Sequence, residues 1–136
     1  MKKHAFVAFA IAVISLSAFS DELENCVQQA MKGHPNDDMY CYAQESLRLE
    51  SQEEKLFSDK LRQLNNLPSS LEISSELKRK ARHDFLEAQK HWKTYVEAAC
   101  RFSSDSNLGS GRARAYSQCK IDLIKRRISD LEVSGF

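Results

Sequence analysis

An apolar series between residues 73 and 102 constrains the fold more than any other feature of the sequence. Eight steps of three or four residues cover 29 positions, about 3.6 residues per step, which is the period of an α-helix. Ser69 and Glu72 stand just before the series with the spacing of a capping box, so the sequence predicts a helix that opens at Ser69. The apolar stripe of this helix is expected to face the core, and its members are Ile73, Leu77, Ala81, Phe85, Ala88, Trp92, Tyr95, Ala99 and Phe102.

Three more segments have helical patterning, and none alternates as a β-strand does. The first, residues 21–33, has Asp21 and Glu24 at capping-box spacing and Gly33 as a natural stop. The second, about residues 37–65, is long and polar; its apolar stripe thins around ESQEE, and NNLP ends it. The last begins near Arg112. We therefore predict an all-α fold, a small bundle of about four helices packed around one core.

The first 20 residues are typical of a secretory signal peptide. MKKH is a short positive segment, AFVAFAIAVISL is an apolar run of twelve residues, and Ala18 and Ser20 suit a signal-peptidase site. A helix that spans a bilayer needs about 20 apolar residues, so this run does not predict a membrane anchor. We expect a signal peptide over residues 1–20 and one mature domain over residues 21–136, which is periplasmic or secreted.

The predicted mature domain contains all four cysteines: Cys26, Cys41, Cys100 and Cys119. An even number of cysteines in a small exported chain favours disulfide bonds, and no two of them are close enough in sequence to begin a zinc site. Four cysteines allow three pairings. We expect Cys26–Cys41 and Cys100–Cys119, because each of these bonds joins consecutive predicted helices across a short connection.

Charge is distributed unevenly along the predicted mature domain. Residues 21–59 carry 3 basic and 10 acidic residues, a net charge of −7, whereas residues 60–136 carry 15 basic and 9 acidic residues, a net charge of +6. This balance argues against a nucleic-acid-binding protein with one dominant basic face. The acidic half includes Glu50, Glu53 and Glu54, and we expect it to offer a surface that attracts a cationic protein partner.

No recognisable catalytic set is present in the sequence. His83, Glu87 and His91 share one helix face, but the two histidines are about 12 Å apart along the axis, so a solvated face is favoured over a metal site. The GSG at residues 109–111 lacks the preceding strand and the further residues of a dinucleotide- or phosphate-binding loop. We expect neither enzyme activity nor a metal ion or other cofactor.

Two motifs in the C-terminal half resemble those of a known protein family. The first has the pattern Q-x-x-W-x-x-Y…C and consists of Gln89, Trp92, Tyr95 and Cys100. The second has the pattern C-x3-L-x3-R-x3-L and consists of Cys119, Leu123, Arg127 and Leu131. With Cys41 followed by Glu45, they resemble the LprI-type lysozyme inhibitors, small exported bacterial proteins, over roughly residues 26–131.

The sequence departs from this family pattern at several positions. The family usually has Arg-Asp where Val96 and Glu97 stand, and Leu-Asn where Glu53 and Glu54 stand. Tyr is usual at the position of Phe57, and Thr is common at the position of Ile124. Polar positions of this kind are where binding residues of the family would be expected.

The resemblance implies that the protein binds and inhibits a lysozyme or a related peptidoglycan hydrolase. A lysozyme cleft holds two carboxyl groups, and a loop that bears a cation or a hydroxyl would suit it as a plug. The segment SNLGSGR, between Cys100 and Cys119, supplies Ser110 and Arg112 for that role. The alternative is a cell-envelope interaction or immunity module that does not inhibit lysozyme.

Overall fold

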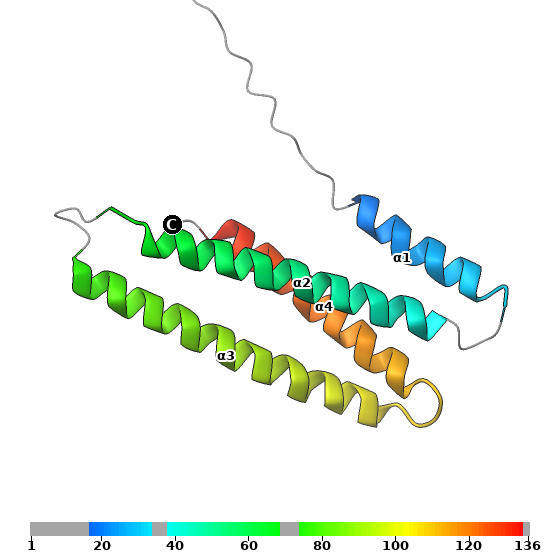
Figure 1. Ribbon diagram of the computed structural model, residues 1–136. Helices are drawn as coiled ribbons and strands as arrows, with labels where there is room; N and C mark the ends of the chain where they lie inside the picture. Colours follow the sequence, from blue (N-terminus) through cyan, green and yellow to red (C-terminus); the bar gives the residue numbers. More distant parts are fainter. Residues whose placement is uncertain (1–16, 34–37, 69–73, 135–136) are drawn as a thin grey trace, which may run out of the picture.

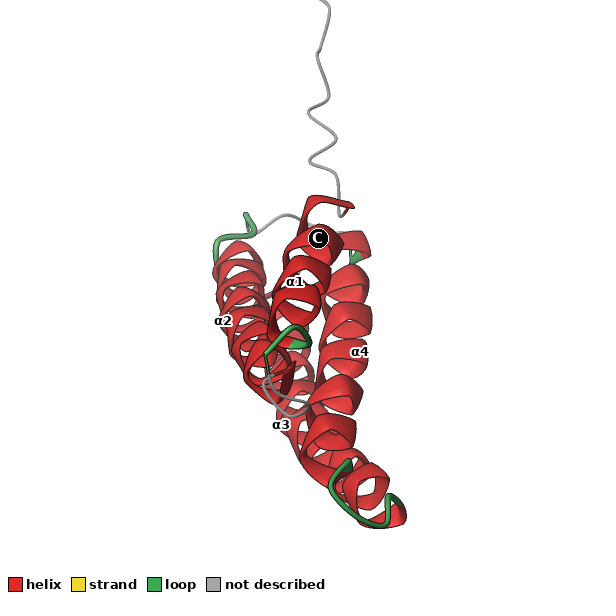
Figure 2. Ribbon diagram, turned by 90° about the vertical axis from the view of Figure 1, so that its right-hand side faces the viewer, coloured by secondary structure: helices red, strands yellow, loops and turns green. Residues whose placement is uncertain are grey.

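The computed structural model describes residues 17–33, 38–68 and 74–134, and the regular structure of these residues consists of α-helices. The helices are α1 (Ser17–Ala30), α2 (Asp38–Asn65), α3 (Ser75–Ser106) and α4 (Arg112–Val133). α4 packs against both α2 and α3, and α1 packs beside α2 (Figures 1 and 2). The predicted all-α bundle is confirmed, and α2 and α4 begin within about one residue of the expected positions.

Two helices begin elsewhere than the capping patterns predict. α1 starts at Ser17, so Asp21 lies inside the helix and not at its start. α3 starts at Ser75, and the hydroxyl of Ser74 accepts a hydrogen bond from the backbone N–H of Leu77 at 3.1 Å. Ser74 is therefore the N-cap residue, while the predicted capping box at residues 69–72 lies outside the described residues, as do residues 1–16 of the expected signal peptide.

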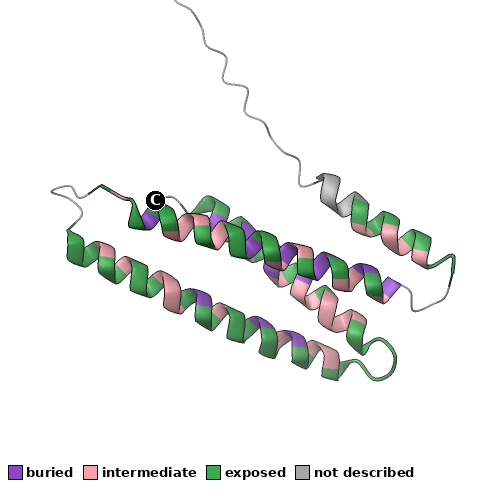
Figure 3. Ribbon diagram, in the orientation of Figure 1, coloured by how far each residue is buried: buried purple, intermediate pink, exposed green. Residues whose placement is uncertain are grey.

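α4 supplies three of the four residues in the central core cluster. Ile121, Ile124 and Ile128 follow one another at steps of three and four residues, so they share one face of the helix. They form a buried cluster with Leu49 of α2, and Leu131 of α4 is also buried (Figure 3). The core thus lies mainly between α2 and α4, and partly buried side chains complete it: Leu23, Tyr42, Leu56 and Trp92.

Both expected disulfide bonds are present. Cys26 of α1 is bonded to Cys41 of α2, with their Cα atoms 5.8 Å apart. Cys100 of α3 is bonded to Cys119 of α4, with their Cα atoms 5.3 Å apart. Each bond joins two consecutive helices across a short connection, as the sequence predicted.

α3 turns a different face to the core than its apolar stripe predicts. Its buried residues are Gln89, Val96 and Cys100. Trp92 lies beside them and packs partly buried against the core cluster. Tyr95, however, is 58% exposed and Phe102 is 75% exposed. The expectation that Tyr95 belongs to the core is therefore wrong.

The reason for this rotation is the position of α4. α3 packs on the bundle mainly through α4, and the bond from Cys100 to Cys119 fixes which side of α3 faces that helix. Val96 precedes Cys100 by one helical turn and is buried on the same side. Trp92 lies at one edge of the predicted stripe and still reaches the core, whereas Tyr95 and Phe102 lie on the flank that α4 does not cover.

Alanine substitutions at Trp92 and Tyr95 test this orientation. We expect Trp92→Ala to lower the free energy of unfolding by about 2 kcal/mol, less than for a fully buried Trp, because part of the ring remains accessible. Tyr95→Ala is expected to cost less than about 0.5 kcal/mol, as for other surface changes. Urea unfolding of both variants measures the difference, and equal costs would contradict the observed rotation of α3.

Candidate partner-binding site

The connection between α3 and α4 forms one end of the molecule (Figures 1 and 2). It consists of residues 107–111, and these residues together with Arg112, the first residue of α4, are here called the hairpin tip. Leu108 is 98% exposed, and Gly109 has a φ of 111°, a backbone conformation that favours glycine. The hairpin tip therefore presents an apolar side chain on a sharply turned segment.

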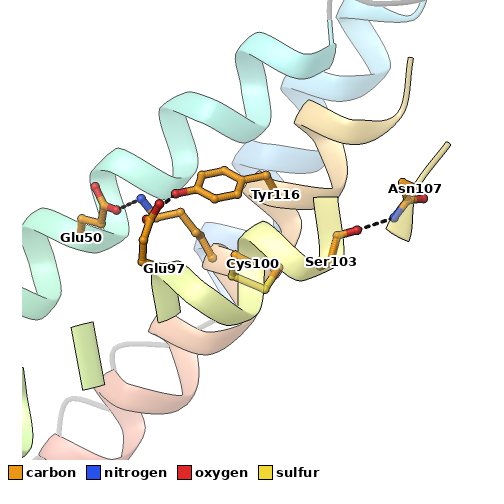
Figure 4. Close-up of a disulfide and its surroundings, with 8 residues drawn as sticks. Glu50, Glu97, Cys100, Ser103, Asn107 and Tyr116 are labelled. Atoms are coloured by element: carbon orange, nitrogen blue, oxygen red, sulfur yellow. Dashed lines mark hydrogen bonds and ion pairs between the residues drawn. A yellow bond between two sulfur atoms is a disulfide. The ribbon is translucent and has the colours of Figure 1, made fainter. Parts of the chain in front are cut away.

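Contacts at its base hold the hairpin tip in place. The Cys100–Cys119 bond joins the two helices, and Cys100 is completely buried (Figure 4). The side-chain amide of Asn107 donates to the carbonyl oxygen of Ser103 at 2.9 Å, and its backbone N–H donates to Ser104 at 3.1 Å. A loop tied down in this way loses little conformational entropy when it binds a partner.

Both predicted loop residues are exposed, and one of them has a partner within the chain. Ser110 is at the hairpin tip, and Arg112 opens α4 with its guanidinium paired to the carboxylate of Asp105. The next arginine, Arg114, instead forms an ion pair with Asp38 of α2 at 2.6 Å. Arg112 is thus available at the surface, whereas Arg114 joins the hairpin to α2.

A second concave feature lies between α2 and α3, and we call it the α2–α3 hollow. It has a volume of 320 Å³. Trp92, Val96 and Ile124 provide its apolar lining. Its charged lining consists of four carboxylates and two ammonium groups, those of Glu50, Glu53, Glu54, Glu97, Lys93 and Lys120.

A chain of polar contacts runs beneath this hollow and joins three helices. Gln89 of α3 donates from Nε2 to Oε1 of Glu53 in α2, at 2.7 Å. Its other amide atom, Oε1, accepts from Nη2 of Arg127 in α4, at 2.9 Å. The Arg127 guanidinium lies 5.6 Å from the centroid of the Trp92 ring. Gln89 therefore connects a buried carboxylate to a cation that does not touch it, and we call these contacts the Glu53–Gln89–Arg127 relay.

Burial determines the behaviour of Glu53. Only 2% of the residue is exposed, and this desolvation raises the pKa of its carboxyl, although the hydrogen bond from Gln89 opposes the rise. The prediction that Glu53 belongs to an exposed acidic surface is wrong. Glu53 instead acts inside the bundle, where it accepts a hydrogen bond from Gln89 of the neighbouring helix.

The other acids of the hollow are paired at its rim. Glu54 accepts from Nζ of Lys93 at 2.8 Å, a hydrogen bond that holds the pKa of Glu54 below its usual value. Glu50 forms an ion pair with Lys120 (Figure 4). Since lysines from the basic half of the chain partly neutralise these acids, the steering field of the acidic half is weaker than the residue count indicates.

Glu97 and Tyr116 form a third pair at this rim. The Tyr116 hydroxyl donates to Oε2 of Glu97 at 2.7 Å, and the two side chains point toward one another (Figure 4). This hydrogen bond raises the pKa of Tyr116 to about 12 and, with a second one from Arg101, lowers that of Glu97. The sequence reasoning missed this pair, since residues 19 positions apart on different helices leave no local signal.

The histidine-containing face of α3 has the solvated character expected of it. The side chains of His83 and His91 are 73% and 78% exposed. In the described part of the chain, no three His, Cys, Asp or Glu side chains are grouped so as to hold a metal ion. No helix among those residues is both long enough and apolar enough to cross a membrane.

Comparison of the sequence with models of known protein families identifies the family of this protein. The model of the family described as lysozyme inhibitor LprI matches residues 26–131, which is most of the chain. The chain belongs to this family. No curated protein and no solved structure matches the chain. The LprI match begins at Cys26 and ends at Leu131, so it includes both disulfide bonds and the buried end of α4.

The LprI motif residues mostly hold the helices together. Gln89, Trp92 and Arg127 take part in the relay or pack against it, and Leu131 is in the core. Tyr95 alone in the first motif is largely exposed. The residues of the two motifs therefore serve mainly to pack the helices together, and they do not by themselves indicate where a partner binds.

The departures from the usual LprI pattern gather at one place. They line the α2–α3 hollow, although they come from three helices, and they are Glu53, Glu54, Val96, Glu97 and Ile124. Phe57 is the exception, because it stacks on Phe85 with 4.6 Å between ring centroids. The five expected departures are therefore neighbours in the folded chain, at the lining of one hollow.

Proposed function

We propose that the protein is exported, binds a lysozyme or a related peptidoglycan hydrolase, and lowers its activity without converting any substrate. Membership of the LprI family over residues 26–131 is the observation that carries this proposal. Two disulfide bonds in so small a domain support an oxidising compartment, the periplasm or the cell exterior. The predicted signal peptide over residues 1–20 supports the same location.

The hairpin tip is the part of the surface that suits inhibition best. A hydrolase cleft is concave, and a projecting, braced loop matches that shape. Arg112 supplies a cation for the carboxyl groups of the cleft, while Ser110 supplies a hydroxyl and Leu108 an apolar contact. On binding, the guanidinium of Arg112 would exchange Asp105 for a carboxylate of the hydrolase.

The acidic half of the chain has a secondary role in this proposal. Glu50 and Glu54 lie at the rim of the α2–α3 hollow and are each paired with a lysine. Their contribution is to orient a cationic hydrolase during its approach, an effect on the association rate that salt weakens. The buried Glu53 takes no part in it.

Inhibition of bacterial lysis by several lysozymes, with the protein titrated, is the direct assay. We expect Arg112→Ala to raise the inhibition constant at least about tenfold, mainly through faster dissociation, because arginines at the centre of an interface are frequent hot spots. The matched control is Arg62→Ala. Arg62 is also exposed and also paired with a nearby Asp, but it lies in the last turn of α2, away from the hairpin tip. This control should inhibit like the unaltered protein.

Two results would contradict the proposal at different levels. If Arg112→Ala and Arg62→Ala inhibit equally well, the hairpin tip is not the contact. If the protein inhibits no lysozyme at tens of micromolar, inhibition is excluded, and a cell-envelope interaction module becomes the best account of the chain.

A further inference from the structure

One flank of α3 is apolar and exposed, and the bundle does not use it. Tyr95 and Phe102 stand out from it, and two smaller residues, Ala88 one heptad before Tyr95 and Ala98 between Tyr95 and Phe102, are also exposed. This flank continues into a shallow hollow of 450 Å³ between α3 and α4, whose lining includes Ala99, Ser103, Ala115 and Cys119. We call the flank and this hollow the lateral face. Exposed apolar surface at regular helical spacing is typical of an interaction surface.

Large and small residues alternate on the lateral face in a self-complementary order. Ala88, Tyr95 and Phe102 follow one another at steps of seven residues, so all three lie on one line along α3. If a second α3 ran antiparallel to the first, with a two-fold axis at Tyr95, each Phe102 would meet the Ala88 of the other copy. Large side chains would then face small ones on both sides of the axis.

The charges of α4 obey the same symmetry. Cys100 and Cys119 are bonded and the two helices are antiparallel, so residues five positions away, Tyr95 and Ile124, lie at about the same level of the hairpin. Asp122 and Arg126 both line the lateral face and stand two residues before and two residues after Ile124. The same two-fold axis therefore places Asp122 of each copy opposite Arg126 of the other.

From these observations, we propose that two copies of the chain pair through their lateral faces, antiparallel and with the two-fold axis near Tyr95. The balance of charge favours a second copy over a strongly charged hydrolase as the occupant. Asp122 and Arg126 cancel, and a surface built for a cationic protein would carry an excess of acid. This pairing is independent of the proposed inhibition, because Leu108, Ser110 and Arg112, the residues proposed to contact the hydrolase, do not line the lateral face.

The pairing also has a consequence for the hairpin tips. From Tyr95 to Asn107 is 12 residues of helix and cap, about 18 Å, so the two tips would point in opposite directions roughly 36 Å apart. A dimer of this kind leaves both tips free. Such a dimer would bind two hydrolase molecules at the same time.

Sedimentation of the protein purified from its producing cell, over a range of concentrations, tests the pairing. We expect a monomer–dimer equilibrium, and we expect Phe102→Glu to weaken it at least about tenfold, since the change acts twice in a symmetric interface. Tyr40→Glu is the matched control, because Tyr40 is an aromatic residue of α2 that is 68% exposed and lies off the lateral face. This control should dimerise normally.

A charge exchange gives a test that does not depend on how well any one variant folds. Arg126→Asp alone and Asp122→Arg alone each place like charges opposite one another twice, and each should weaken pairing by roughly tenfold. Mixed in equal amounts, the two variants should form a heterodimer of near-normal strength, because both opposing pairs are then of opposite sign. A mixture that pairs no better than either variant alone would overturn the proposed alignment.

Two further outcomes would overturn the pairing itself. One is a protein that remains monomeric up to the millimolar range. The other is a monomer whose binding to lysozyme is abolished by Phe102→Glu and unaffected by Tyr40→Glu, which would assign the lateral face to the hydrolase. Inhibition by the hairpin tip is measured separately with Arg112→Ala, so either proposal can fail while the other stands.

Discussion

Replacing Gln89 with alanine is expected to lower the free energy of unfolding by about 3 kcal/mol or more at neutral pH. Among the residues that the structure describes, the substitution removes the one hydrogen-bond donor to the Glu53 carboxylate and an acceptor of Arg127, in the interior between three helices. A buried carboxylate without a donor costs far more than the lost packing of one amide. Gln63→Ala is the control, since Gln63 is exposed on α2, and it should cost less than about 0.5 kcal/mol.

The pH dependence distinguishes this electrostatic cost from simple loss of packing. The hydrogen bond from Gln89 lowers the pKa of Glu53, so its removal raises that pKa further in the folded state. A carboxyl whose pKa is higher in the folded than in the unfolded state makes a stabilising contribution at acid pH. That contribution is lost as the pH rises through the folded-state pKa. The cost of Gln89→Ala should therefore shrink as the pH is lowered through the folded-state pKa values of Glu53 in the variant and in the unaltered protein, both of which lie above the usual pKa of a Glu carboxyl.

Urea unfolding at several pH values measures this cost. A cost that is the same at acid and neutral pH would mean that Gln89 acts only by filling space. A cost that grows toward acid pH would contradict the assignment of Glu53 as the titrating group.

Local signals were sufficient to predict the helices and the disulfide bonds. Apolar periodicity marked each helix, and the break at NNLP and the loop before Arg112 marked two of the connections. The pairing of Cys100 with Cys119 followed from closure across one connection. Properties of this kind depend on residues that are near one another in sequence, and the sequence shows them directly.

The orientation of α3 depends on its neighbours and could not be predicted in the same way. Periodicity identifies an apolar flank, but the position of α4 decides which part of it is covered. A second series did contain the answer: Phe85, Gln89, Trp92, Val96 and Cys100 also recur at steps of three and four. It includes an amide, so it is less apolar than the series that contains Tyr95. The family motif names Gln89 and Cys100, and both are buried on this second series.

The burial of Glu53 was missed for a similar reason. Glu53 stands four residues after Leu49 and three before Leu56, which are core positions of α2, yet its charge placed it on the predicted acidic surface. Its hydrogen-bond donor is Gln89, 36 residues away on another helix. The thinning of the α2 stripe around ESQEE marks the place where a polar contact replaces apolar packing in the interior.

Removing one disulfide bond at a time is expected to separate stability from inhibition. The chain-entropy relation gives a cost of about 3 kcal/mol for Cys100→Ala with Cys119→Ala, and about the same for Cys26→Ala with Cys41→Ala. The loops that the two bonds close are similar, with sequence separations of 19 and 15 residues, so the two double variants form a matched pair. Thermal unfolding should show comparable decreases in melting temperature.

Inhibition should not fall equally in the two double variants. The Cys100–Cys119 bond lies at the base of the hairpin tip, whereas the Cys26–Cys41 bond joins α1 to α2. Without the Cys100–Cys119 bond, α3 and α4 can separate near Asn107, so the hairpin tip must become ordered when it binds. Each 1.4 kcal/mol of this ordering cost weakens inhibition by about tenfold. Loss of the Cys26–Cys41 bond leaves the tip braced. Lysis assays at a temperature where both variants remain folded measure the difference, and an equal loss of inhibition would place the hydrolase contact away from the hairpin tip.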